Sequence, residues 1–118
     1  MESKQAFHLA ALAECPGLGS HRLKLLLETY GDAELIWHLP AAELTRRVPM
    51  PRQLCANVNA FRRGHLDRPA ELQDLCTSRD IRLCTIEDEE YPNILKEIFS
   101  PPMVLYYRGT LVPDALRI

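Results

Sequence analysis

The stretch CPGLGSHRLKLLL (residues 15–27) decides how the N-terminal half of the chain folds. Pro16 disfavours helix in the residue before it, so a helix over residues 5–14 is expected to end there. Two glycines one residue apart allow positive φ values, and Ser20 is expected to cap a following helix. The apolar residues of that helix recur at helical spacing and form one stripe: Leu23, Leu26, Leu27 and Tyr30. The pattern predicts two helices joined by a tight turn, with Leu18 tucked between them.

This turn has two interpretations. In the first, the backbone N–H groups at the start of the second helix and the positive end of its dipole form a site for phosphate. An apolar-Pro-Gly-apolar-Gly-polar turn before such a helix is the helix-hairpin-helix pattern, which resembles proteins that hold the DNA backbone without reading bases. In the second, the glycines only permit the bend. The residues expected to contact DNA phosphate are Gly17, Gly19, Ser20, Arg22 and Lys24.

The rest of the first 78 residues also predicts helices with short connections. Gly31 ends the second helix, and Asp32 and Asp67 are expected to cap later ones. Prolines mark further starts and breaks, at Pro40, Pro49, Pro51 and Pro69. We expect five or six helices in a bundle that is sterile-alpha-motif-like or helix-hairpin-helix-like, forming a domain over residues 1–78.

The pattern changes after Asp80. Residues 81–86 and 104–107 are short, apolar and β-prone, and a helix is expected between them, with Pro92 in its first turn. Strand, helix, strand predicts the beginning of an α/β unit with parallel strands. We therefore expect residues 79–118 to be the incomplete start of a Rossmann-like domain, with another strand beginning in residues 111–118. Two strands alone leave exposed edges that would pair with another copy.

Composition and charge restrict the function classes. The chain has 118 residues, 47% hydrophobic and 25% charged, with no apolar run long enough to cross a bilayer and no secretory signal pattern. A cytoplasmic protein without membrane contact is expected. The net charge of −2 gives no overall attraction to nucleic acid. The arginines at positions 46, 47, 52, 62, 63 and 68 form either a solvated helical face or a phosphate-contacting surface.

No residues suggest catalysis, a cofactor or a metal. The four cysteines contain no CxxC pair, and the histidines show neither HxxxH nor HxxE spacing. Cys55, Cys76 and Cys84 are expected to be buried reduced thiols. The acidic run at residues 87–90 is expected to be solvated and to complement a helix dipole. We therefore expect no enzyme.

The segment IRLCTIEDEEYPNILKEIFSPPMVLYYRGTL (residues 81–111) resembles the start of the conserved region of the DNA-processing protein A family (DprA, also called Smf). The positions that carry the resemblance are Ile81, Arg82, Thr85, Asp88, Tyr91, Pro92, Leu95, Ile98, Pro101, Pro102, Leu105, Tyr106 and Gly109. The Pro-Gly-apolar-Gly turn and Tyr30-Gly31 agree with the helical domain with which such proteins begin.

This resemblance implies a bacterial protein that binds single-stranded DNA in natural transformation and helps to load the RecA recombinase. In the family, the main DNA site and most of the self-association surface lie in a domain that begins with a VAIVGSR-like motif, which this sequence does not contain. The chain is thus expected to be an accessory N-terminal domain. The alternative is a protein-interaction module that binds no DNA itself.

Overall fold

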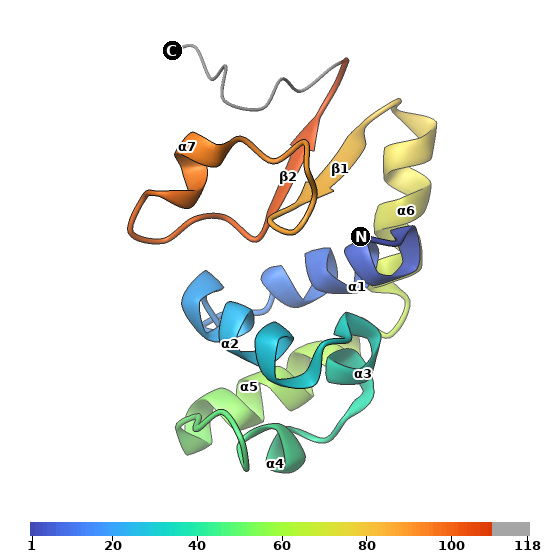
Figure 1. Ribbon diagram of the computed structural model, residues 1–118. Helices are drawn as coiled ribbons and strands as arrows, with labels where there is room; N and C mark the ends of the chain where they lie inside the picture. The colour runs from blue at the N-terminus through green and yellow to red at the C-terminus, as the bar shows by residue number, and fades with distance from the viewer. Residues whose placement is uncertain (110–118) are drawn as a thin grey trace.

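Six helices occupy the first 78 residues, within the expected number, and a seventh lies between two short strands (Figure 1). The computed structural model describes residues 1–109. The helices are α1 (Ser3–Ala13), α2 (Ser20–Tyr30), α3 (Ala33–His38), α4 (Ala41–Leu44), α5 (Arg52–Gly64), α6 (Arg68–Ser78) and α7 (Asn93–Lys96). The strands are β1 (Arg82–Thr85) and β2 (Val104–Tyr107). Within residues 1–109, none of the helices combines the length and apolarity needed to cross a membrane.

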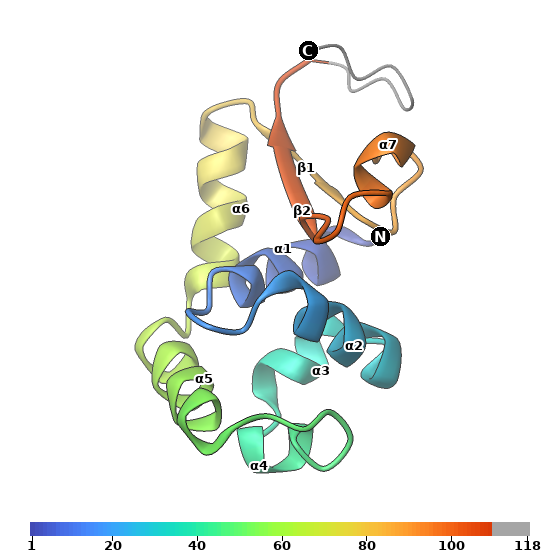
Figure 2. The ribbon, with the colours of Figure 1, turned by 90° about the vertical axis from the view of Figure 1, so that its left-hand side faces the viewer.

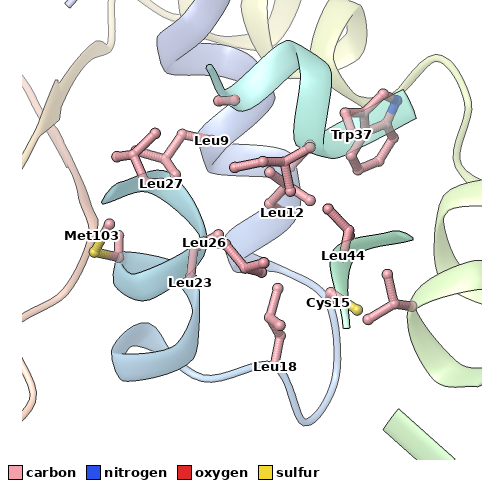
Figure 3. Close-up of a cluster of buried hydrophobic side chains, with 14 of the residues drawn as sticks. Leu9, Leu12, Cys15, Leu18, Leu23, Leu26, Leu27, Trp37, Leu44 and Met103 are labelled. Atoms are coloured by element: carbon pink, nitrogen blue, oxygen red, sulfur yellow. The ribbon is translucent and has the colours of Figure 1, made fainter. Parts of the chain in front are cut away.

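The turn between α1 and α2 follows the prediction except at the cap. Gly17 and Gly19 both have positive φ, +82° and +72°, which side-chain-bearing residues rarely adopt. Leu18 is 2% exposed and points from the turn into the core (Figure 3). The prediction that Ser20 caps α2 is wrong, because Gly19 is the N-cap and Ser20 is the first helical residue. The left-handed conformation of Gly19 lets it turn the chain into the helix one residue earlier than expected.

Most of the core comes from α1, α2 and α3, which pack leucine, alanine and one tryptophan against each other. Leu9, Leu23 and Ile36 are at most 1% exposed, and Trp37 is 4% exposed. Figure 3 shows side chains from α1, α2 and the α3–α4 region meeting in one cluster. Cys15, Cys76 and Cys84 are buried and Cys55 is half-buried, all as free thiols, which agrees with the predicted reduced cysteines.

The two strands do not form the predicted parallel unit. They pair antiparallel, with Arg82 opposite Tyr107 and Thr85 opposite Val104. A parallel crossover needs a helix that runs back along the sheet, but α7 has four residues and a length of about 6 Å. Pro92 is its N-cap, and Pro101 and Pro102 lie between its end and β2. The chain therefore returns through a loop and enters β2 in the opposite direction.

The sheet packs on α1 and α6 and shares the core of the helices. Met103, which precedes β2, is 3% exposed and lies at the edge of the buried cluster beside α2 (Figure 3). Tyr91 is fully buried, and its hydroxyl donates a hydrogen bond of 2.7 Å to the carbonyl of Pro102. The ranges 1–78 and 79–118 were expected as separate domains, and within the described residues they share one hydrophobic core.

One edge of the sheet is open. Among the described residues the sheet has two strands, so the outer edge of β2 has no partner strand. Figure 2 shows α6 on the left of the two strands and α7 on their right. The strand predicted to begin in residues 111–118 lies outside the described residues.

Candidate nucleic-acid interface

The N-terminus of α2 is not capped by a side chain. Its N-cap is Gly19, which has no side chain. The first backbone hydrogen bond of the helix runs from the Leu23 N–H to the Gly19 carbonyl oxygen, at 3.1 Å. Among the described residues, the amides of Ser20, His21 and Arg22 donate no hydrogen bond. These donors and the positive end of the helix dipole favour an anion.

A small hollow of about 160 Å³ lies beside this helix start, and we call it the α2 hollow. On one side it is lined by Ser20, His21 and Lys24, which helical spacing places on one face of α2. Lys96 and Ser100 line the opposite side, and the Ser20 and Ser100 hydroxyls are 2.7 Å apart. The polar half of the lining thus combines two lysines, a histidine and two hydroxyls, the groups that contact phosphate oxygens. The other half is apolar and consists of Ile86, Ile98, Phe99, Pro101 and Met103.

The ammonium group of each lysine has one neighbouring side chain. Lys96 Nζ lies 5.9 Å from the centre of the Tyr91 ring, a cation–π contact that holds it beside the sheet. Lys24 Nζ is 4.0 Å from a Glu28 carboxylate oxygen, and both side chains are more than half exposed. An exposed pair of this kind is weak, so Glu28 leaves Lys24 available to a stronger anionic partner.

The five residues predicted to contact phosphate do not form one group. Ser20 and Lys24 line the hollow, and Gly19 directly precedes them as the N-cap of α2. The other two residues do not line it. A Cβ on Gly17 would lie 3.6 Å from the Leu54 side chain, so this glycine faces α5. Arg22 is half-buried. Lys96 and Ser100 were missed because they are more than 70 residues away in the sequence.

The six arginines of the arginine-rich segment differ in their surroundings. Four of its six arginines have partners within the molecule: Arg46 with Glu43, Arg47 with the Tyr30 ring, Arg62 with carbonyls at the end of α3, and Arg68 with Glu14. The Arg68–Glu14 pair is bidentate, with N–O distances of 2.7 and 3.0 Å. Arg62 alone of the six is buried, whereas Arg46, Arg47, Arg52 and Arg63 are exposed to solvent.

The acidic run after β1 is partly structural. Asp88 was expected to be solvated, but it accepts hydrogen bonds from the Thr85 backbone N–H, at 2.7 Å, and from the Met1 ammonium group. Its ligand atoms lie within 4.8 Å of those of Cys84 and Glu90. Burial and the neighbouring carboxylates raise the pKa of Cys84 to about 11, so the thiol stays protonated. A metal ion bound to this group would have to displace the thiol proton.

A second group of potential metal ligands is formed by His8 on α1 with Glu34 and His38 on α3, whose ligand atoms also lie within 4.8 Å of one another. No histidine or cysteine spacing within one segment indicates this group, because its ligands come from two different helices. The only local sign is the four-residue spacing of Glu34 and His38, which places both on one face of a helix.

The resemblance to the DprA family rests on residues 81–111 and on the glycine turn. No family model, curated protein or solved structure matches this chain. Membership of that family, and the activities that it implies, are therefore proposals that rest on the sequence motif and the glycine turn.

Proposed function

We propose that this chain is a nucleic-acid-binding domain that holds a backbone phosphate of single-stranded DNA at the N-terminus of α2. The observation that carries the proposal is a helix start capped by glycine, with uncapped amides, flanked by Lys24 and Lys96 in one hollow. A phosphate there accepts hydrogen bonds from backbone N–H and hydroxyl groups and is attracted by two ammonium groups. Such contacts bind DNA without reading its sequence.

The wider setting is the one that the sequence resemblance implies. In this proposal, the bundle is the sterile-alpha-motif-like or helix-hairpin-helix-like domain of a cytoplasmic DprA-like protein. In that family a Rossmann-like domain carries the main single-stranded DNA site and most of the self-association surface. Residues 79–118 correspond to its beginning in the sequence resemblance, although β1 and β2 pair antiparallel and not as its parallel strands. Loading of RecA belongs to that whole protein, and the α2 hollow is an accessory contact.

The test is fluorescence anisotropy with a labelled single-stranded oligonucleotide over a range of salt concentrations. Lys24→Glu and Lys96→Glu each remove a phosphate contact, so both are expected to weaken binding. Each is also expected to reduce the slope of log affinity against log salt by about 0.7. The control is Arg79→Glu, an exposed residue at the end of α6 with the same change of charge. It is expected to leave that slope unchanged.

Two results contradict the proposal. Undetectable binding by the wild-type chain at low salt assigns the glycine turn a purely structural role. The second result is that Lys24→Glu and Lys96→Glu weaken DNA binding no more than Arg79→Glu does. Binding then reflects general electrostatic attraction of DNA to the protein, without a phosphate site at α2.

A second candidate function, a protein-interaction module, is favoured by the apolar surface around α7. Ile94 and Ile98 are about half exposed, and the Phe99 side chain is fully exposed. The sequence predicts an apolar face on this helix, but no residue of α7 is buried. Retention of a protein partner by the wild-type chain and its loss with Phe99→Ser, without detectable DNA binding, would select this function.

A further inference from the structure

His8, Glu34 and His38 meet on the surface formed by α1 and α3, away from the α2 hollow. His8 is on α1, and Glu34 and His38 are one turn apart on α3. The imidazole rings of His8 and His38 have their centres 6.1 Å apart, and the carboxylate of Glu34 lies 3.9 Å from His8 Nε2. One ligand atom from each of the three residues lies within 4.8 Å of the ligand atoms of the other two.

The orientation of His8 is fixed by its own helix. Its Nδ1 is 2.7 Å from the carbonyl of Lys4, and because a carbonyl only accepts, Nδ1 must carry the proton. In the neutral ring, Nε2 therefore presents a lone pair toward the Glu34 carboxylate. Two acceptors 3.9 Å apart, with no proton of their own to share, leave a place for a cation that contacts both. An Nδ1–H donated to a backbone carbonyl is also the usual outer-shell arrangement of histidines that bind metal through Nε2.

A cation already lies at this place. The Lys4 ammonium is 2.9 Å from Glu34 Oε2, while its side chain is 62% exposed and free to move into water. Around a tetrahedral Zn²⁺, nitrogen and oxygen ligands lie about 3.4 Å apart. Glu34 and His8 are close to this separation, and His38 is exposed, so its ring can rotate inward. Metal binding therefore requires only movement of surface side chains.

We propose that His8, Glu34 and His38 form a binding site for a divalent transition-metal ion, with Zn²⁺ as the representative. Two imidazole nitrogens and one carboxylate oxygen suit zinc, copper, nickel or iron, and not calcium or magnesium, which prefer oxygen ligands alone. Three protein ligands leave the fourth position for water. The ion joins α1 to α3 and takes the place of Lys4 on Glu34.

The test begins with titration of the full chain with Zn²⁺ by isothermal calorimetry and thermal unfolding. One bound ion is expected, and Tm is expected to rise by roughly 10 °C when free Zn²⁺ is about 100-fold above the dissociation constant. His38→Ala removes an exposed ligand and is expected to weaken binding by at least about tenfold. His21→Ala and His65→Ala remove histidines outside the cluster and serve as matched controls with unchanged affinity.

Lys4→Met is the variant that separates a metal site from an ordinary ion pair. Removal of the ammonium frees Glu34, so Zn²⁺ is expected to bind more tightly than to the wild-type chain. If Lys4, Glu34 and His8 form only a structural network, this variant has the same Zn²⁺ affinity as the wild type.

Co²⁺ identifies the ligands by spectroscopy. Coordination by two histidines and a carboxylate gives visible absorption without the strong near-ultraviolet band of a thiolate ligand. The proposal is overturned if Zn²⁺ does not bind, if His38→Ala binds it like the wild type, or if Co²⁺ shows the thiolate band that coordination by a cysteine produces. Far-ultraviolet circular dichroism of each variant verifies that the fold is retained.

Discussion

Arg62 shows how a single charged side chain can serve the fold. It was grouped with five other arginines as solvated or phosphate-contacting, yet it is 7% exposed. One guanidinium nitrogen donates to the carbonyls of Ile36, at 2.8 Å, and Trp37, at 3.1 Å, and also to that of Leu39. Burial lowers the pKa of Arg62, but an arginine stays charged at neutral pH. The side chain thus satisfies the carbonyls that the short helix α3 leaves unpaired.

Replacement of Arg62 by methionine is expected to destabilise the protein by about 3 kcal/mol, because several buried carbonyls lose their charged donor. The measurement is the free energy of unfolding in urea. Arg63→Met, at the exposed neighbouring position, is the control and is expected to change it by less than about 0.5 kcal/mol. Equal effects of the two variants would show that the carbonyl contacts contribute no stability.

At the scale of the element, α3 depends on caps at its N-terminus as well. Asp32 is the N-cap, and its Oδ1 accepts from the Leu35 backbone N–H at 3.0 Å and from Gln5 Nε2 at 2.9 Å. Gln5 Oε1 in turn accepts from the Ala33 backbone N–H at 2.6 Å. A helix of six residues has little intrinsic stability, so these contacts from its own cap and from α1 hold it in place.

The Asp32 cap is expected to make stability depend on acidity. The hydrogen bonds from Leu35 and Gln5 hold the pKa of Asp32 below its ordinary value. A lowered folded-state pKa gives a stabilisation that is fully present above the unfolded pKa, about 3.9, and is lost as the pH falls through the folded value. Asp32→Asn keeps a capping oxygen without the charge. The advantage of the wild type over this variant, measured by unfolding free energy, is therefore expected to shrink below about pH 4.

Other carboxylates titrate in both proteins, so the difference between them isolates Asp32. A difference that stays constant from pH 6 to pH 3 would contradict an ionised cap in the folded state.

At the scale of the whole molecule, the open edge of β2 remains the least protected feature. The Ile86 N–H donates to Met103 O at 3.0 Å, so the alternation of an antiparallel ladder turns the backbone groups of Val104 and Tyr106 outward. The strand VLYY has no charge or proline, the devices that usually protect such edges. Among the described residues no third strand pairs with this edge.

This edge is expected to make the chain self-associate at high concentration by strand pairing, as the sequence predicts. Sedimentation velocity over a concentration series measures it. Tyr106→Pro removes an outward N–H and is expected to abolish association. Tyr106→Ala loses the same aromatic side chain but keeps the N–H, and is expected to associate. A wild-type chain that stays monomeric at every concentration would contradict strand pairing.

Local elements were predictable because their signals are local. Gly31, Asp32 and the leucine stripe of α2 define boundaries through backbone conformation and helical spacing, and the structure confirms these boundaries. Both strands also lie where β-prone residues predict them. The wrong prediction of parallel strands concerns tertiary contacts. The direction of β2 depends on the path of the chain through α7 and the loop that follows it. The N-cap of α2 is Gly19 and not the predicted Ser20, because the positive φ of this glycine lets the helix begin directly after it.

The candidate sites divide in the same way. Gly19, Ser20 and Lys24 were predictable because a glycine turn before a helix creates donors whatever the rest of the chain does. Lys96 and Ser100 complete the α2 hollow only because the loop before β2 folds back over that helix. Cluster formation by His8, Glu34 and His38 depends on the packing of α1 against α3.

The sequence by itself determined the helical bundle, the glycine turn and the two β-prone segments, because backbone preference and hydrophobic spacing act over a few residues. Only the tertiary structure decided the antiparallel direction of the strands, the burial of Arg62 and the groups of side chains that meet at each site. These depend on contacts between residues that lie about 20 to 90 positions apart, such as Arg62 with Ile36 and Ser20 with Ser100. Such contacts form only when packing of the core brings distant segments together, and no local pattern records that packing.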